Sequence, residues 1–230
     1  MNLRALIMTA LIATTAASCT VNNREKDNTA TDKAPITKPQ LTLAGDRFTP
    51  EALWAMGRIG SVKADIETGW VAYTVGYYSV EENRSTTWIR ICNPFEGMKV
   101  DDEFVGSDPA WFGSSGWIAY LKGGKLYLRR DKEEVEVEGA EDVEGFLLSP
   151  MRDKIVLIKQ VKTVPTTADL YPDLPKASGR VVDDLMYKHW DEWTETAPQP
   201  FVCELELTWY GEGERIKTAK IGASKNISAG

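Results

Sequence analysis

Hydrolysis of an ester or amide bond through a covalent acyl-enzyme intermediate needs an activated nucleophile, such as a serine held in a strained turn. In α/β-hydrolases this serine lies in Gly-x-Ser-x-Gly between a strand and a helix, because the tight turn exposes its hydroxyl. Ser224 follows Gly222 at the required spacing, but Asn226 replaces the second glycine and no helical pattern follows. The Gly-Ser-Ser-Gly run at 113–116 has the wrong spacing. The sequence therefore predicts no catalytic nucleophile.

A catalytic triad also needs a histidine base, and the chain has one histidine, His189. It lies in segment 178–193, whose apolar residues recur at helical spacing and predict an amphipathic helix. A histidine on the apolar face of such a helix is typically packed, so we interpret His189 as structural and not as a general base. The apolar face comprises Val182, Leu185, Met186, His189 and Trp193.

Metal and cofactor chemistry has equally little support in the sequence. One histidine and three cysteines without a C-x-x-C pair form no recognisable ligand set, so we predict neither a metal site nor a cofactor. Cys92 and Cys203 lie far apart in the sequence, and we expect both to be buried free thiols. The net charge is −7 and lysine and arginine form no stripe, which argues against a nucleic-acid partner.

The first 18 residues have the pattern of a signal peptide, with Arg4 before an apolar core at 5–13. The small residues before Cys19 resemble the lipobox of bacterial lipoproteins, in which the cysteine is acylated and becomes the first residue. Ala16 stands where a larger apolar residue is usual, so cleavage by ordinary signal peptidase is the alternative. Either route exports the protein to the bacterial periplasm or outer membrane. We expect Cys19 to carry the lipid that makes the only membrane contact.

Residues 19–46 have almost no large apolar side chains, and we expect them to form a flexible tether. A coil of this length would have a root-mean-square reach of roughly 30 Å. The folded part is expected to span residues 47–230. It begins with a short helix that Thr49 can cap, with Pro50 in its first turn and Gly57 after its end.

A short pattern of a small polar residue, glycine, tryptophan and an apolar strand occurs twice in the folded part. It reads TGWVAY at 68–73 and SGWIAY at 115–120, and a looser copy, RDKIVLI, follows at 152–158. A turn and strand that recur every ~40–50 residues are typical of β-propeller blades. The predicted fold is therefore all-β, a partial propeller of about three WD40-like blades.

Strand patterns fill in the three blades, and the amphipathic helix at 178–193 is expected to be an insert in the third. Segment 133–138 (EEVEVE) alternates strictly, and we expect an outer strand whose charges protect the sheet edge. A first strand is expected to start at 58–62, after the short helix. The other predicted strands are 70–75, which 76–78 extends or bends, and 86–92 in the first blade, 117–121 and 126–129 in the second, and 146–148, 154–161, 201–207 and 216–221 in the third.

Three segments together resemble a known family. They are TPEALWAMGRIGSV at 49–62, GWVAYT at 69–74 and, most specifically, RVVDDLMYKHWDEW at 180–193. They are similar to the N-terminal part of S9 serine peptidases, the prolyl oligopeptidase family, in its secreted dipeptidyl-peptidase and acylaminoacyl-peptidase branch. The resemblance covers about residues 47–215. It implies a propeller that caps an α/β-hydrolase domain and restricts access to small peptides.

The resemblance also implies where to look for a substrate contact, because dipeptidyl peptidases of this family hold the substrate's ammonium group with paired propeller acids. Asp183-Asp184 and Asp191-Glu192 are such pairs, but they lie on the polar side of the predicted helix. We interpret them as its solvated face.

The chain departs from the family in length, since about three blades leave no room for a hydrolase domain, and we expect the chain to be inactive on its own. Two hypotheses follow. The chain is the propeller portion of an S9 peptidase, whose partners would be further blades, a hydrolase domain and peptide substrates. Alternatively, it is a non-catalytic envelope lipoprotein whose propeller-type module binds another chain.

Overall fold

The computed structural model describes residues 33–42, 45–113, 116–177, 179, 195–211 and 215–228. Every strand among the described residues belongs to one compact unit, Ala34–Gly230. Within the described ranges, no helix combines the length and the apolar character that crossing a bilayer requires.

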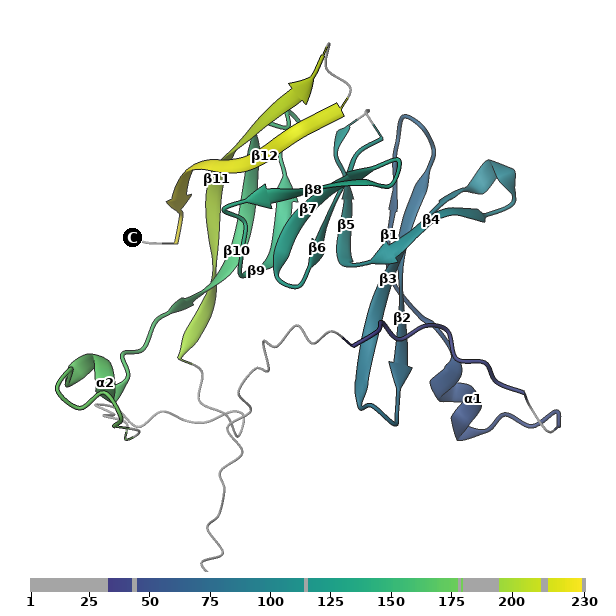
Figure 1. Cartoon of the computed structure of the whole chain (residues 1–230), viewed down its shortest axis with the longest axis horizontal. Coiled ribbons are helices and arrows are strands. Elements are labelled where there is room, and N and C mark those ends of the chain that lie inside the picture. The colour runs from purple at the N-terminus through teal and green to yellow at the C-terminus, as the bar shows by residue number, and fades with distance from the viewer. Residues whose placement is uncertain are drawn as a thin grey trace, which may run out of the picture. The chain divides into compact units, whose positions relative to one another are not determined.

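The first blade is an antiparallel sheet in which each strand pairs with the next one along the chain (Figure 1). The sequence predicted its first three strands, and a short 3-10 turn follows the third. The fourth strand was missed because its sequence, KVDDEFV, is mostly polar. The elements are β1 (Arg58–Ala64), β2 (Val71–Ser79), β3 (Arg84–Asn93), η1 (Pro94–Glu96) and β4 (Lys99–Val105).

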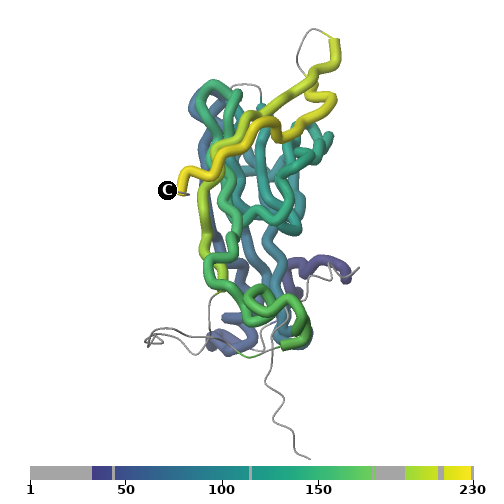
Figure 2. Tube along the Cα trace, turned by 90° about the vertical axis from the view of Figure 1, so that its left-hand side faces the viewer, coloured from purple at the N-terminus to yellow at the C-terminus, as the bar shows by residue number. Residues whose placement is uncertain are grey.

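The second and third blades each have four strands in the same antiparallel order, and together they form one eight-stranded sheet. Figure 2 shows β11 and β12 running side by side near the C-terminus, as in Figure 1. The second blade comprises β5 (Ser107–Trp111), β6 (Ile118–Lys122), β7 (Lys125–Arg130) and β8 (Glu133–Glu138). The third comprises β9 (Val143–Leu148), β10 (Lys154–Lys162), β11 (Thr196–Tyr210) and β12 (Arg215–Asn226), with the short helix α2 (Thr167–Leu170) between β10 and β11.

The two blades join where β12 runs parallel to β8, with Ala219 opposite Val137 and Lys220 opposite Glu138. The prediction that residues 133–138 form an outer edge strand is therefore wrong, because β8 has a neighbour on each side. Alternation did place the charges of β8 toward solvent. It also placed Val137 in the core, beside Ala219 of β12, and the sequence pattern could not show this pairing.

The same tight connection between the first two strands of each blade explains the sequence repeat. A backbone N–H at the end of the first strand donates to the carbonyl five residues later. Gly69 and Gly116 directly precede two of these carbonyls and have φ of 75° and 71°, a left-handed conformation that glycine adopts without steric cost. The three donor–acceptor pairs are Asp65–Trp70 (2.8 Å), Phe112–Trp117 (2.7 Å) and Ser149–Lys154 (3.0 Å).

The second blade is buried on both faces, as a blade between two neighbours should be. Successive residues of a strand point to opposite faces. Trp117, Ala119 and Leu121 accordingly lie in the core shared with the third blade, and Ile118 and Tyr120 in the core shared with the first. The neighbouring blades contribute Ile155, Leu157, Cys203 and Leu205 to the larger core and Ala72, Ile89 and Phe104 to the smaller. Three stacked blades establish a partial β-propeller.

The predicted helix before the first blade is α1 (Pro50–Ala55). Thr49 caps it as expected, since Thr49 Oγ1 accepts a hydrogen bond of 3.2 Å from the Ala52 N–H. The end of the helix packs closely on β2. A Cβ added to Gly57 would lie only 2.7 Å from Val75 Cγ2, so glycine is required by space at this position.

Part of the expected tether is docked on the first blade, where Figure 1 shows it in dark purple crossing β2 and β3. The Ile36 N–H donates to Thr86 Oγ1 (2.9 Å), Trp88 Nε1 donates to the Ile36 carbonyl (2.7 Å), and Arg84 donates to the Ala34 carbonyl (2.6 Å). Ala34 and Ile36 thus contribute backbone contacts to the first blade. Composition could not indicate this docking, because the segment contributes backbone groups rather than apolar side chains.

The helix predicted at 178–193, including His189 and both acidic pairs, lies outside the described residues. The same holds for the predicted signal peptide and Cys19.

Candidate functional site

A cleft of about 650 Å³ lies between the first two blades. In a four-stranded antiparallel meander, the connection between strands one and two lies at the same end of the sheet as the connection between strands three and four. These connections from two adjacent blades converge here. The first blade contributes Thr68, Trp70, Ile91, Asp101 and Asp102; the second contributes Trp111, Gly116, Arg129, Arg130, Asp131 and Lys132.

An ion pair joins the two blades within the cleft lining. Arg129 on β7 donates to both carboxylate oxygens of Asp102 on β4, at 2.9 and 3.2 Å. The two side chains are only 12% and 14% exposed, and the guanidinium lies 4.3 Å from the centre of the Phe104 ring. Burial alone would lower the pKa of Arg129, but the hydrogen bond and charge of Asp102 raise it. The raised pKa keeps Arg129 charged, and its two hydrogen bonds to Asp102 join the second blade to the first.

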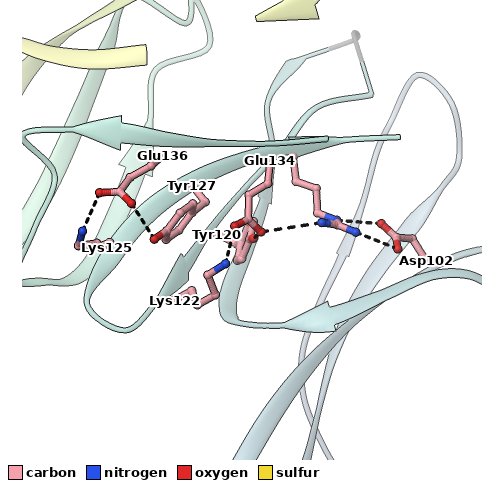
Figure 3. A network of polar contacts seen from close by, with 8 residues as sticks. Asp102, Tyr120, Lys122, Lys125, Tyr127, Glu134 and Glu136 are labelled. Carbon is pink, nitrogen blue, oxygen red and sulfur yellow. Dashed lines mark hydrogen bonds and ion pairs between the residues drawn. The ribbon is translucent and has the colours of Figure 1, made fainter. Parts of the chain in front are cut away.

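A second carboxylate extends this network across the second blade (Figure 3). Glu134 accepts hydrogen bonds from the Tyr120 hydroxyl and from Lys122, and its carboxylate lies 3.8 Å from Arg129. Burial raises the pKa of Tyr120, and the bond to Glu134 adds to this effect. Burial would also raise the pKa of Glu134, but its bonds from Lys122 and Tyr120 outweigh burial and lower it. The tyrosine thus stays protonated and the glutamate charged.

Glu136, two residues further along β8, repeats the arrangement near the hairpin at 123–124 (Figure 3). It accepts hydrogen bonds from Lys125 Nζ (2.7 Å) and the Tyr127 hydroxyl (2.9 Å). Burial and the bond to Glu136 raise the pKa of Tyr127 to about 12. None of these groups is poised to exchange a proton near neutral pH. The contacts of Glu134 and Glu136 join strands within the second blade, and the Arg129–Asp102 pair joins that blade to the first. The network is suited to this structural role and not to acid–base catalysis.

Three polar groups that line the cleft have no partner elsewhere in the described chain. They are the Asp101 carboxylate, the Lys132 ammonium and the indole N–H of Trp70. By contrast, the Trp111 indole donates to the Lys63 carbonyl at 3.0 Å. The free groups offer one negative charge, one positive charge and an aromatic surface. They are therefore available to a ligand.

The structure places several residues that the sequence singled out. Ser224 lies within β12, which continues to Asn226, so no strand-to-helix elbow forms around it. Cys92 and Cys203 are buried free thiols, as expected, and Cys203 donates to Ser224 Oγ at 3.3 Å. Burial raises the pKa of Cys92, which keeps the thiol protonated and unreactive. Across the residues that the structure describes, no cluster of histidine, cysteine or acidic side chains could hold a metal ion.

Sequence reasoning missed the cleft. Trp70 was found only as a repeat residue, and Asp101, Asp102 and Arg129 read as ordinary polar residues at strand ends. No local pattern shows that turns from two separate sheets face each other.

Comparison with known proteins identifies the family. No family model matches the chain. Dipeptidyl-peptidase 5 of Porphyromonas gingivalis is 33% identical over 180 residues, and dipeptidyl-peptidase 5 of Porphyromonas endodontalis is 35% identical over 178 residues. These matches cover 74% and 72% of the chain. The chain is homologous to dipeptidyl-peptidase 5. It spans 26% of the length of each of these relatives and matches the propeller part of the S9 peptidases.

Solved structures agree on the fold. A Pyrococcus horikoshii acylaminoacyl peptidase superimposes with a TM-score of 0.51 at 12% identity, covering 77% of this chain and 26% of that one. An acylaminoacyl peptidase in complex with Z-Gly-Gly-Phe-chloromethyl ketone gives a TM-score of 0.50 at 12% identity, with 76% and 26% covered. The S9 resemblance and the partial propeller inferred from sequence are confirmed.

Proposed function

We propose that these blades are the substrate-access portion of an S9-type dipeptidyl peptidase. The observation that carries the proposal is the 33% identity to dipeptidyl-peptidase 5 over 180 residues, together with blades stacked as in a propeller. Among the described residues, an ion pair between Arg129 and Asp102 joins the first two blades, and no nucleophile elbow is present. Their role would be to bound the path to a hydrolase domain, so that small peptides enter and folded proteins do not.

A chimera tests this role. Residues 34–230 of this chain, which include every strand of the three blades, would replace the corresponding blades of Porphyromonas gingivalis dipeptidyl-peptidase 5, and release of a chromophore from a dipeptidyl substrate would be measured. Because the blades only have to complete the propeller, we expect activity within about tenfold of the parent enzyme. We also expect the chimera, like the parent, to leave folded proteins uncleaved.

The matched control is the same chimera with Trp117→Ala, which removes a fully buried side chain between the second and third blades. It should lose activity or begin to cleave larger substrates. A chimera that folds but releases no dipeptides would contradict the proposal and favour the alternative, a binding module of an envelope lipoprotein.

We further propose that the protein is exported and anchored through a lipid on Cys19. The support is the signal-like sequence before Cys19. Metabolic labelling with a fatty-acid analogue, followed by membrane fractionation, tests it. Label should be incorporated in the wild type and lost in Cys19→Ala. Label that persists in the variant would contradict the anchor.

A further inference from the structure

A second cleft, of about 630 Å³, lies beside the first blade, between helix α1 and the segment 34–41 that docks on β3. One wall is formed by residues 38–41 of this segment. The other wall is formed by Phe48 and by Ala52, Ala55, Met56 and Gly57 in and after α1. We call this cleft the α1 groove.

Both walls of the α1 groove are fixed to the first blade. The Ile36 N–H donates to Thr86 Oγ1 (2.9 Å), and Trp88 Nε1 donates to the Ile36 carbonyl (2.7 Å), which holds the docked segment. On the side of the helix, the Trp54 ring lies 4.9 Å from the Tyr78 ring of β2. The groove is therefore preformed, and its volume falls within the range of small-ligand sites.

The lining of the groove is apolar except at the start of the docked segment. Leu41, Phe48 and Met56 are 43%, 64% and 55% exposed, so their apolar surface is open to a ligand. Lys38 is the one charged residue of the lining among the described residues, and its ammonium group has no partner there. The groove thus combines an apolar surface with a single available positive charge.

This combination selects among apolar ligands. A peptide would bring a backbone N–H and C=O with each residue, and burial of these groups without partners is unfavourable. Besides Lys38, only Gln40 contributes a polar side chain to the described lining. An alkyl chain brings no polar group, and each methylene that it buries fully can raise affinity about fourfold. The single lysine favours an alkyl chain that ends in an anion.

We propose that the α1 groove binds a free fatty carboxylate of medium chain length. The alkyl chain would lie against Leu41, Phe48 and Met56, and Lys38 would bind the carboxylate. An acyl group attached to Cys19 would have no free carboxylate, so the proposed ligand is a separate molecule. The proposal rests neither on the peptidase function nor on the lipid anchor, and each can fail alone.

Isothermal titration of the full chain with Cys19→Ala, which cannot carry an acyl group at that residue, tests the site. The probes are laurate, octanoate and dodecyltrimethylammonium, each below its critical micelle concentration. Laurate should bind with a stoichiometry of one. Octanoate, four methylenes shorter, should bind at least about tenfold more weakly. Dodecyltrimethylammonium, which reverses the charge, should bind about three- to fivefold more weakly, as expected for an exposed ion pair.

Two results of this titration would overturn the proposal. Absence of saturable laurate binding would do so and would leave the groove to a protein partner. Binding of octanoate or of dodecyltrimethylammonium as tightly as laurate would also do so, because the groove would then select neither chain length nor charge.

Variants locate the binding. Phe48→Asp places a charge in the groove at an exposed position and should weaken laurate binding at least about tenfold. The matched control is Leu53→Asp, at a residue of α1 that is 51% exposed and outside the groove lining, and it should leave binding unchanged. Lys38→Gln should weaken laurate binding about three- to fivefold without weakening dodecyltrimethylammonium binding.

Thermal melts show whether each variant is folded, and Lys38→Gln tests the site even if Phe48→Asp does not fold. Equal losses of laurate binding in Phe48→Asp and Leu53→Asp would indicate general association with exposed apolar surface and would overturn the assignment. Unchanged laurate binding in Lys38→Gln would also overturn it.

Discussion

Arg129 of the second blade donates two hydrogen bonds to Asp102 of the first, and this ion pair joins the two sheets. Removing one partner leaves the other as an uncompensated and nearly buried charge. We therefore expect Asp102→Asn to lower the free energy of unfolding by about 3 kcal/mol. Urea denaturation measures this. Glu82→Gln, which breaks an exposed pair with Arg84, is the control and should cost less than about 1 kcal/mol. Equal costs would contradict the role of the Arg129–Asp102 pair.

The connection between the first two blades passes very close to a buried ring. A Cβ on Gly106 would lie 2.4 Å from Tyr120 Cδ2 and 3.0 Å from Ile89 Cδ1. Gly106→Ala should therefore force the blades apart and destabilise the protein by about 1–3 kcal/mol. Gly45→Ala, where no atom lies within 4 Å of the added methyl, should be nearly neutral. Thermal melts of the two variants compare them, and a neutral Gly106→Ala would show that this contact is absent.

The two repeat tryptophans should differ sharply in their contribution to stability despite their similar sequence context, TGWVAY and SGWIAY. Trp117 is completely buried between the second and third blades, whereas Trp70 is partly exposed at the cleft. We expect Trp117→Ala to cost about 3–5 kcal/mol and Trp70→Ala to cost about 1 kcal/mol. Chemical denaturation of both variants tests this difference. A larger loss at Trp70 would contradict the packing order of the blades.

Two tyrosines of the second blade, Tyr120 and Tyr127, should make the stability of the protein fall at alkaline pH. Burial and hydrogen bonds to Glu134 and Glu136 raise the pKa of Tyr120 and of Tyr127, the latter to about 12. A raised pKa means that the folded state retains a proton that the unfolded state loses near pH 10. The stabilisation is thus complete below pH 10 and is lost as the pH rises toward 12 and beyond. Melting temperatures between pH 9 and 12 should fall, and Tyr127→Phe should flatten the decline.

The matched control for this pH dependence is Tyr171→Phe, a tyrosine that is 48% exposed. It should retain the wild-type decline. If both substitutions gave the same profile as the wild type, the tyrosine–glutamate network would not contribute to stability at alkaline pH.

Local features of the fold followed from the sequence. The strands that begin at Val71, Ile118 and Lys154 were found from their repeat, because each follows the same tight turn. The Thr49 cap was found because N-capping depends only on residues a few positions away. In each case the determining contacts lie within about one turn of the chain.

Non-local features were not found. The docking of Ile36 on Thr86 uses backbone groups, which every sequence possesses, and no composition signal marks it. The β8–β12 pairing and the cleft depend on how separate sheets stack. Asp101 and Lys132 became a candidate site only when two turns from different blades were seen to border one cavity.

We infer that these blades belong to a larger ring, in which further blades would cover the outward faces of the first and third blades. Ile59 and Val62 on β1 are 70% and 59% exposed, and Leu147 on β9 is 67% exposed. Closed propellers cover such faces with further blades, and exposed apolar patches promote association. Light scattering of the purified chain measures this most directly. We expect the chain to self-associate in a concentration-dependent way, and we expect Leu147→Lys to reduce this self-association. A monodisperse monomer with a sharp cooperative melt would show instead that the strands form a complete small domain.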